Sequence, residues 1–289
     1  MIGFSQNSSS VLPNTRRHIS TLALYTTIYP GVESFLQTWY GSVCAQTDPD
    51  YQLWIGLDAI AVDAVKDLIG ADPNANWVSG APGETPAQVR HRALGQISEV
   101  CDGVVLVDSD DILHPSRVAA ARVALRTSEL TGCALRLVDQ NGDDLGLTMQ
   151  LPPRTGPEDV LPRNNVFGFS NSAFRSDLLR RCLPIPADTV LVDWLLATRA
   201  WLFGARLTFD SAVRMDYRQH GANMARTLSP YSAEQVVQDT DRVRHHFRIL
   251  CTSPMAGVVA ERFASVERVA IDIETFYEQV VRQPMQLKQ

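Results

Sequence analysis

The sequence contains no apolar run long enough to cross a membrane. A helix needs about 20 consecutive, mostly apolar residues to span a bilayer, and no stretch of the 289-residue chain approaches that length. Residues 1–14 are rich in serine and asparagine and do not contain the apolar segment of a secretory signal peptide. We therefore expect a cytoplasmic protein with no membrane span.

Cysteine is scarce, and its spacing follows no known framework. An odd number of cysteines does not suit a set of disulfides, and no two have the spacing of zinc ligands. A reducing compartment is the simpler interpretation of this pattern. The five cysteines are Cys44, Cys101, Cys133, Cys182 and Cys251.

Positive charge is also in short supply. The chain has 26 lysines and arginines against 32 aspartates and glutamates, which gives a formal net charge of -6. This balance gives no electrostatic support for nucleic acid or an anionic membrane as the main partner. Apolar residues make up 45% of the chain, which is enough for a substantial core.

The first half of the chain alternates strand and helix patterns. Short apolar runs read as strands, and segments with apolar residues at helical spacing lie between them. This alternation favours a parallel sheet covered by helices on both faces, which is an α/β fold. The expected strands are 20–28, 51–57, 77–78 and 103–107, and the helices between them begin near Val32, Ala61 and Thr85.

The second half is more mixed and ends in two helices. We expect strands at 133–138, 145–150 and 206–215, a loop at 152–165 and a buried helix at 190–203. The last apolar stripe, from Val259 to Val280, alternates steps of four and three. This spacing predicts a helical hairpin packed on the body, with a contact between copies of the chain as the alternative. The expected divisions are a lead at 1–18, a catalytic domain at 19–228 and a helical region at 229–289.

Three carboxylates follow the fully apolar strand 103–107. Asp108, Asp110 and Asp111 lie within four positions of one another, and ligands of open α/β sheets bind beyond the carboxyl ends of strands. Because like charges held close together repel one another, a divalent cation would stabilise the group. Hard oxygen ligands select Mg²⁺ or Mn²⁺. The alternative is a solvated loop in which Asp111 caps the helix after Pro115.

The order of these segments resembles the family 2 glycosyltransferases, which have the GT-A fold. The resemblance covers roughly residues 20–225. It implies a GT-A-like, mostly parallel sheet and metal-dependent transfer of a hexosyl or deoxyhexosyl group from a nucleotide-diphosphate sugar. The acceptor would be a glycan, a lipid-linked or a small-molecule hydroxyl, as in polysaccharide biosynthesis. The matching segments are 107–111, 134–142, 167–175, 192–194 and 217–223.

The resemblance also implies roles for residues on the donor side. The nucleotide would bind at the end of the first strand and at the carboxylate that ends the second. Arginines would contact the phosphates, and acidic residues with one histidine would hold Mn²⁺ or Mg²⁺. The implied donor residues are Thr26, Tyr29, Pro30, Asp58, Arg90, Asp108 and Arg218, and the implied metal ligands are Asp110, Asp111 and His220.

On the acceptor side, Asp193 matches the catalytic base of inverting family members. It lies in an apolar helix start, with Thr189 as the expected N-cap, and such surroundings raise the pKa of a carboxyl group. Many relatives carry Glu-Asp here, whereas this chain has Val192 before Asp193. Asn171, Arg175 and Trp194 fall where the family shapes its acceptor site. Asp193 could instead serve only the helix dipole, and Trp194 could simply belong to the core.

Three other functions compete with sugar transfer. Asp108 and Asp110 have the spacing of phosphohydrolases that form an aspartyl-phosphate, but that motif normally follows the first strand of its domain. The missing acidic residue at Val192 leaves open a protein that binds nucleotide sugars without catalysis. A nucleotidyltransferase would carry a Gly-rich, basic loop after its first strand, and residues 29–33 do not provide one.

Overall fold

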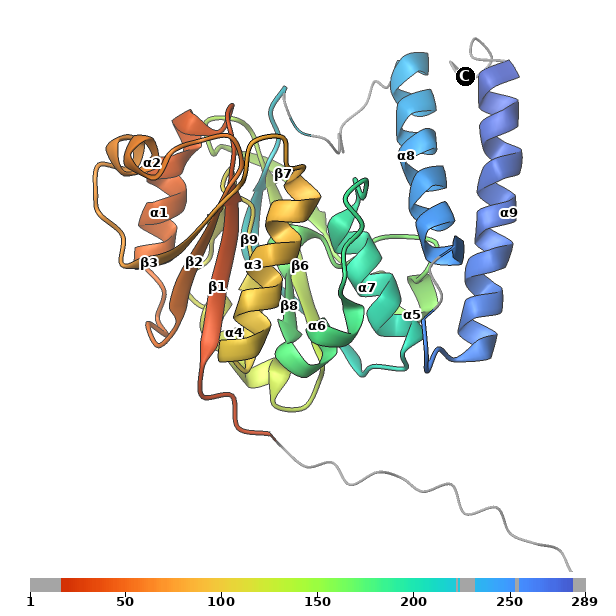
Figure 1. Cartoon of the computed structure of the whole chain (residues 1–289), viewed down its shortest axis with the longest axis horizontal. Helices are drawn as coiled ribbons and strands as arrows, with labels where there is room; N and C mark the ends of the chain where they lie inside the picture. Colours follow the sequence, from red (N-terminus) through yellow and green to blue (C-terminus); the bar gives the residue numbers. More distant parts are fainter. Residues whose placement is uncertain (1–16, 222, 224–231, 253–254, 283–289) are drawn as a thin grey trace, which may run out of the picture.

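The centre of the molecule is a mixed β-sheet. The computed structural model describes residues 17–221, 223, 232–252 and 255–282. Within these ranges nine strands form one sheet in the order β3-β2-β1-β4-β8-β6-β9-β5, and β7 pairs with β6 (Figure 1). Residues 1–16 of the expected lead, and the expected boundary between residues 228 and 229, lie outside the described residues.

The first four strands are parallel, as the alternating pattern predicts. They are β1 (Leu22–Ile28), β2 (Gln52–Leu57), β3 (Ala75–Ser79) and β4 (Gly103–Leu106). Every residue of β1 and β4 is buried, which is why both segments are almost continuously apolar. The helices between them are η1 (Glu33–Phe35), α1 (Leu36–Cys44), α2 (Val62–Ile69) and α3 (Pro86–Val100).

Helix α3 begins where its sequence signals place it. The Thr85 hydroxyl accepts a hydrogen bond from the Gln88 amide, and the Gln88 side chain accepts one from the Thr85 amide. Pro86 occupies the first turn, where its missing N–H costs nothing. This capping box fixes the start of the helix that carries Arg90 beside the end of β1.

The second half of the sheet mixes strand directions. Its strands are β5 (Ile112–Leu113), β6 (Leu130–Val138), β7 (Asp144–Met149), β8 (Ser172–Arg175) and β9 (Leu207–Arg218). Its helices are α4 (Arg117–Leu125), α5 (Pro157–Val160), η2 (Phe169–Asn171), α6 (Ser176–Cys182) and α7 (Val192–Leu202). The unpredicted features include the short helix α5 inside the expected loop, the short helix η2, and the strands β5 and β8.

Strand β8 sets the geometry of the sheet. It runs antiparallel to both β4 and β6, so that Arg175 lies opposite Gly103 and Ala173 opposite Val105. The beginning of β8 therefore lies beside the end of β4. As a result, η2, which directly precedes β8, lies at the edge of the sheet where β1, β2 and β4 end.

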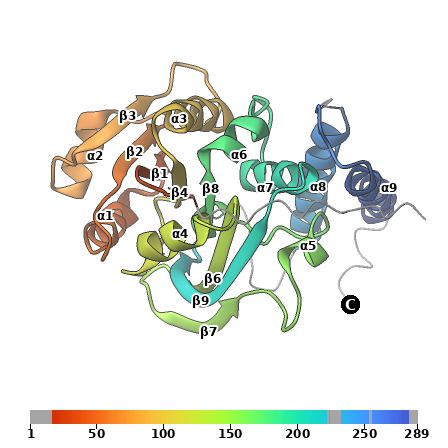
Figure 2. The same ribbon diagram turned by 90° about the horizontal axis from the view of Figure 1, so that it is seen from below.

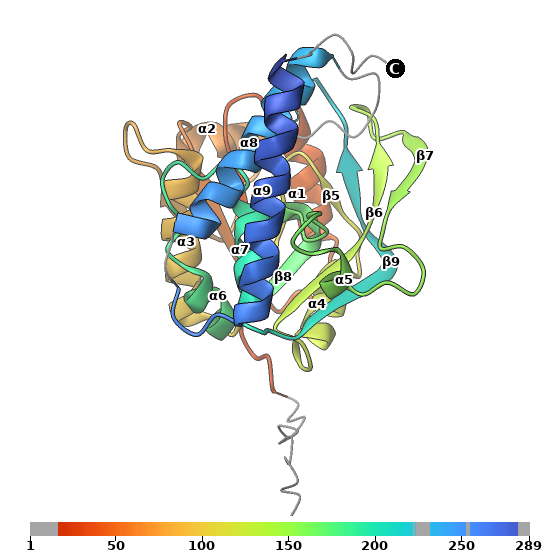
Figure 3. The same ribbon diagram turned by 90° about the vertical axis from the view of Figure 1, so that its right-hand side faces the viewer.

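The two C-terminal helices form a hairpin against α7. Helices α8 (Ala233–Thr252) and α9 (Ala260–Arg282) lie side by side (Figures 1 and 3). On α9, Val266 and Val280 of the predicted stripe are buried within the chain. Glu274 accepts hydrogen bonds from Arg244 and Arg248 of α8. The stripe thus packs internally, and a contact between copies of the chain stays a prediction.

Aromatic packing joins the hairpin to the body. The ring of Trp194 on α7 stacks on His246 of α8 at a centroid distance of 4.6 Å, and Phe247 meets the same indole edge-on at 5.8 Å. No helix among the described residues has the length and apolar character of a membrane span.

The hairpin's attachment can be tested at Phe247, whose side chain is 1% exposed. We expect Phe247→Ala to lower the free energy of unfolding by about 3 to 5 kcal/mol, because the deletion leaves a cavity between α7 and α8. Urea denaturation followed by circular dichroism measures this change. The control is Val123→Ala on α4, where a 61% exposed side chain predicts a change within about 0.5 kcal/mol. Equal effects of the two substitutions would contradict the described packing.

Candidate active site

A cavity of about 620 Å³ lies at the edge of the sheet where β1, β2 and β4 end. This volume falls within the range of about 300 to 1,000 Å³ that is usual for small-molecule sites. Residues from both halves of the chain and from the C-terminal hairpin contribute to it. The polar side chains that line it include those of Thr27, Tyr29, Asp58, Arg90, Asp108, Asp110, Asn165, Ser170, Asn171, Asp193, Tyr217, Asp239 and Arg242.

The first two carboxylates of the acidic cluster face this cavity. Asp108 is half-buried, and Asp110 is 5% exposed. The Oδ2 atom of Asp110 lies 2.9 Å from Nε2 of His220, which is 110 positions later in the sequence. The fold thus brings together two of the three residues that were expected to hold a metal ion. Phe35 packs on the same imidazole ring at a centroid distance of 4.8 Å.

Asp111 has a different environment, which corrects its expected role. Its Oδ1 accepts a hydrogen bond from the backbone amide of Arg218 at 2.7 Å, and its Oδ2 accepts one from the Ser170 hydroxyl. Asp111 is 1% exposed and does not line the cavity. Burial, reinforced by Asp110 and Asp108, raises its pKa well above the usual carboxyl range. Since both oxygens are engaged by protein donors, these contacts do not support Asp111 as a metal ligand.

The capping alternative for Asp111 is also wrong. The N-cap of α4 is Ser116, whose own side chain makes no capping hydrogen bond, and the Gln46 side chain accepts one from the Val118 amide in the first turn. The carboxylate of Asp111 points instead into the protein, where it joins the end of β4 to η2 and to the end of β9.

Arg90 forms an ion pair with the first carboxylate of the cluster, Asp108. Its guanidinium lies 4.6 Å from the centre of the Phe169 ring, 3.6 Å from a carboxylate oxygen of Asp108, and 3.4 Å from the Thr27 hydroxyl. Burial raises the pKa of Asp108 to about 7, against the lowering effect of Arg90 and with further increases from Asp110 and Asp193. Arg90 therefore offsets only part of the negative potential at this end of the cavity.

Asp193 lies in the first turn of α7 and lines the cavity. Its Oδ1 accepts a hydrogen bond from the backbone amide of Trp194 at 2.8 Å, and its Oδ2 accepts one from the Asn165 amide group at 3.0 Å. Burial raises the pKa of Asp193 despite these hydrogen bonds. The expected N-cap is wrong: the cap position is Leu191, and the Thr189 hydroxyl has no partner among the described residues.

Trp194 is both a cavity residue and a core residue. It lines the cavity, and it is also part of the core, with an exposed fraction of 8%. The imidazole of His246 supports its ring, and burial lowers the pKa of His246 to about 3. The histidine is therefore neutral and acts here as a packing group.

Two expected donor residues at the end of β1 do not reach the cavity. Thr27 lines it and Thr26 does not, because successive strand residues face opposite sides of the sheet. Thr26 is fully buried, and its hydroxyl has no partner among the described residues. Pro30 is exposed outside the cavity, whereas its neighbour Tyr29 lines it.

Arg175 and Arg218 also differ from their expected roles. Arg175 ends β8, at the opposite end of the sheet from Asp108, and pairs with Asp177 and Glu129. The guanidinium of Arg218 donates to the backbone oxygens of Asp110 and Gln140, each at 2.8 Å. Neither arginine lines the cavity. Arg175 therefore cannot contact an acceptor there, and Arg218 holds the loops around the site.

Asn171 lines the cavity but is largely committed to the fold. Its amide nitrogen donates to the carbonyl oxygens of Cys133 and Val166, at 2.9 and 3.1 Å. Its Oδ1 is buried without a partner among the described residues. We expect it to shape the cavity wall between η2 and β6.

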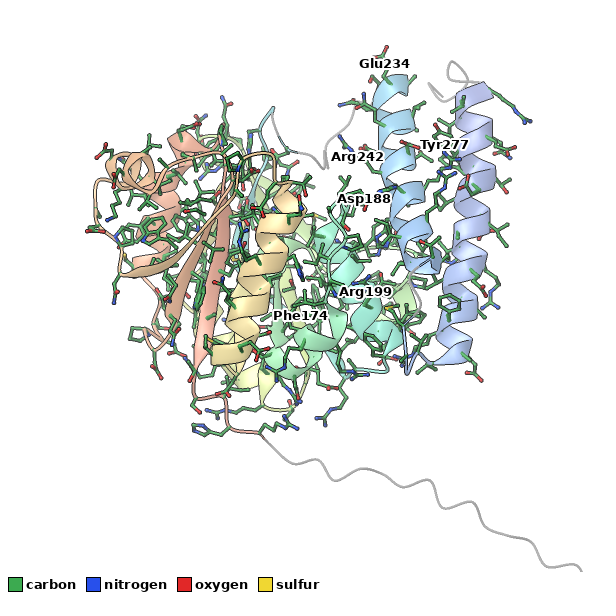
Figure 4. The ribbon with its side chains drawn as sticks, in the orientation of Figure 1. Phe174, Asp188, Arg199, Glu234, Arg242 and Tyr277 are labelled. Carbon is green, nitrogen blue, oxygen red and sulfur yellow. The ribbon has the colours of Figure 1, made fainter. Side chains whose placement is uncertain are left out.

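Several cavity residues were missed by the sequence analysis. Tyr217 belongs to the recognised 217–223 segment, but nothing in the segment distinguishes it from its neighbours. Asp239, Arg242 and Val243 come from α8, and Arg242 lies on the side of that helix that faces the sheet (Figure 4). Val243 lies four and seven positions before the buried Phe247 and Leu250, a spacing that indicates a buried helix face but not the cavity beneath it.

The metal-ligating groups at the cavity suit a cation that binds together with a phosphate-containing substrate. Within the described residues, no group of three or more histidine, cysteine, aspartate or glutamate side chains is arranged to hold a metal ion. Asp108 and Asp110 supply two carboxylates that line the cavity. The His220 imidazole does not line it, but its Nε2 lies 2.9 Å from Oδ2 of Asp110. Mg²⁺ commonly uses only one or two carboxylates and completes its shell with substrate phosphates and water. The residues present fit that kind of site.

Comparison with known proteins gives matches in structure only. No protein-family model matches the sequence, and no curated protein matches it. TarS 1–349 of S. aureus aligns with a TM-score of 0.60 at 14% identity, over 93% of this chain and 75% of that chain. Its complex with UDP-GlcNAc gives a TM-score of 0.57 at 15% identity, over 88% and 71% of the two chains.

A second protein shares this architecture. The mannosyltransferase PcManGT from Pyrobaculum calidifontis, in complex with GDP-Man and Mn²⁺, gives a TM-score of 0.57 at 13% identity, over 95% of this chain and 75% of that chain. A longer TarS structure is covered over 43% of its length. At these identities the similarity shows the fold, and it confirms the predicted GT-A-like α/β architecture with its C-terminal helices.

The structural role of Asp111 can be tested by stability. We expect Asp111→Ala to lower the free energy of unfolding by about 2 to 4 kcal/mol, because it leaves the Arg218 amide and the Ser170 hydroxyl unsatisfied, and such groups cost about 1 to 3 kcal/mol each. The control is Asp58→Ala, since the Asp58 carboxylate makes no hydrogen bond among the described residues. Denaturant titration measures both variants. Normal stability with weakened Mn²⁺ binding would instead favour Asp111 as a ligand.

Proposed function

We propose that this protein transfers a sugar from a nucleotide-diphosphate donor to a hydroxyl group of an acceptor. The observation that carries the proposal is a single cavity that is lined by the carboxylates of Asp108, Asp110 and Asp193. Its setting supports this function, because the structures that share the fold include a complex with UDP-GlcNAc and a mannosyltransferase bound to GDP-Man and Mn²⁺.

The donor would occupy the side of the cavity formed by the ends of β1, β2 and β4. Tyr29 and Asp58 line the part farthest along β1 and β2, where an aromatic ring and a carboxylate suit a nucleoside. Arg90 suits the diphosphate, since its planar guanidinium matches phosphate oxygens and Phe169 and Thr27 hold it in place. Asp108, beside Arg90, would then lie near the ribose.

Asp110 and His220 would hold Mn²⁺ or Mg²⁺ together with the donor's phosphates. When bound, such an ion neutralises the negative charge that develops on the departing diphosphate. The protein's own part is to keep the Asp110 carboxylate at the cavity. Arg218 does so by donating a hydrogen bond to the backbone oxygen of Asp110. Asp111 anchors the segment that carries Asp110 and Asp111, because it accepts a hydrogen bond from the Arg218 amide.

Asp193 would act as the base in an inverting displacement at the anomeric carbon. Its raised pKa strengthens its affinity for a proton, which suits removal of a proton from the acceptor hydroxyl. The preceding residue, Val192, is 2% exposed and packs in the core. An acidic side chain at that position would lie away from the cavity, so the proposed reaction needs one carboxylate here and not two.

The acceptor would lie on a mostly apolar wall. Trp194, Val190 and Leu191 form it near Asp193, and Met149 of β7 and Val243 of α8 extend it. The ion pair between Asp239 and Arg242, at 2.9 Å, is the polar feature that α8 adds. A wall of this kind suits the apolar face of a glycan or the aglycone of a lipid-linked or small-molecule acceptor.

Donor binding provides the first test. We expect Mn²⁺ together with UDP-GlcNAc or GDP-Man to raise the melting temperature, since a ligand at 100 times its Kd stabilises the folded state by about 2.7 kcal/mol. Asp110→Ala should abolish the Mn²⁺-dependent part of this shift. The matched control is Glu267→Ala, which removes an exposed carboxylate from α9. An undiminished shift in Asp110→Ala would exclude Asp110 as the ligand.

Catalysis provides the second test. Asp193→Asn keeps the shape and the hydrogen bond from the Trp194 amide but removes the base. We expect nucleotide-sugar binding to persist and the transfer rate to fall by about 10²- to 10⁴-fold, the usual contribution of a general base. Radiolabelled transfer and thermal shift measure the two properties. Donor binding without turnover in the wild type would favour the non-catalytic alternative, and a product of retained configuration would argue against Asp193 as the direct base.

The acidic limb of the rate profile provides the third test. A base works in its deprotonated form, so the rate falls as the pH drops through its pKa. Because the pKa of Asp193 is raised, we expect this loss to begin at a pH above the ordinary aspartate value of about 3.9. Rates measured from about pH 4 to pH 8 cover the titration of a carboxyl group with a raised pKa. The wild-type rate should decrease toward low pH, and the residual rate of Asp193→Asn should not show this decrease. An unchanged profile in that variant would assign the limb to another group.

A further inference from the structure

A second cavity, of about 430 Å³, lies between α4 and the strands β6 and β9. Helix α4 packs against both strands on the side of the sheet away from α7 (Figure 2). The cavity's apolar lining comes mainly from the alanines of α4. Its polar lining consists of Ser116, Arg117, Thr131, Asp210 and Arg214.

Arg117 is buried in this cavity's wall with few partners. Its side chain is among the largest that are fully buried, with an exposed fraction of 1%. One guanidinium nitrogen donates to the backbone oxygen of Ser172 at 2.9 Å, and Nε has no partner among the described residues. No carboxylate in the described part of the chain lies within 4 Å of it.

The other buried arginines that the structure describes are better satisfied. Arg122 and Arg175 each pair with a carboxylate. Arg199 and Arg218 each donate to at least two backbone oxygens. Burying a charge without a counter-charge is costly, because the interior replaces neither its hydration nor its ionic partner. Arg117 alone in this group combines a single backbone acceptor with an adjacent cavity.

The surroundings of Arg117 leave the cavity with a positive balance. Arg214 is paired with Asp210 at 2.9 Å and also donates to the Ser116 hydroxyl at 2.6 Å. These two charges cancel, so the charge of Arg117 is left over. Cys133 adds none, because burial raises the pKa of its thiol. The two guanidinium groups offer planar donors suited to phosphate or carboxylate oxygens.

We propose that this cavity binds a small anion whose phosphate or carboxylate group contacts Arg117 and Arg214. Any apolar part of such a ligand would lie on Ala120 and Ala124 of α4. The site is separate from the proposed donor site, because the two cavities share no lining residue. It is connected to that site through the chain: Arg117 holds the carbonyl of Ser172, which directly follows η2.

Inorganic phosphate is the probe for the test, with chloride at matched ionic strength as the reference. Binding is measured by isothermal titration calorimetry and by thermal shift on the full chain. We expect phosphate to bind the wild type and the Arg90→Gln variant equally, since Arg90 belongs to the other cavity. Arg117→Met should abolish binding, and Arg214→Gln should weaken it by about 10-fold, roughly the effect of losing one hydrogen bond to a charged group.

Three outcomes would overturn the proposal. They are the absence of any phosphate response beyond that of chloride, loss of the response in Arg90→Gln, and an unchanged response in both Arg117→Met and Arg214→Gln. If Arg117→Met does not fold, Arg214→Gln decides the question, because its side chain is partly exposed and lies at the cavity's edge. Arg206→Gln, which removes a cation outside both cavities, controls for a general loss of positive charge.

Discussion

A buried carboxylate, Asp111, joins the three segments that build the candidate active site. It accepts hydrogen bonds from the Ser170 hydroxyl of η2 and from the backbone amide of Arg218 at the end of β9. The Ser170 hydroxyl in turn accepts a hydrogen bond from the amide of Asp108. Because these groups are buried, each bond would be expensive to leave unmade. The cluster therefore divides its carboxylates between one that holds the site together and two that face the cavity.

That division leaves a concentrated negative charge at the cavity. Asp108 and Asp110 are offset in part by Arg90 and by the hydrogen bond to His220. A site of this kind gains stability from a bound cation, and a cation in turn attracts a diphosphate. The same end of the cavity that repels a free anion thus accepts one together with its metal ion, which links the electrostatics of the fold to the proposed donor.

The C-terminal hairpin completes the site from the other side. Its packing on α7, through His246 and Phe247 against Trp194, is a core contact, and it brings Arg242 and Val243 of α8 to the cavity. The wall on which an acceptor would lie therefore depends on how the hairpin packs. We propose that helix α8 is a structural part of the active site and not an independent appendage.

The sequence by itself determined the elements and the end of the sheet where the chemistry lies. Period and capping signals located β1, β4 and α3, since local preferences decide such features. The acidic cluster also stands at the predicted end of the sheet, where Asp108 and Asp110 line the cavity. The sequence could not decide to which side of the sheet a strand side chain points, or in which direction a strand runs. Thr27 and not Thr26 faces the cavity because one residue along a strand reverses the side chain, and Arg175 lies at the far end because β8 runs antiparallel. Contacts between residues more than 50 positions apart decide which carboxylate accepts hydrogen bonds from the protein. Such contacts also decide which helix contributes to the cavity wall, and only the folded chain specifies them.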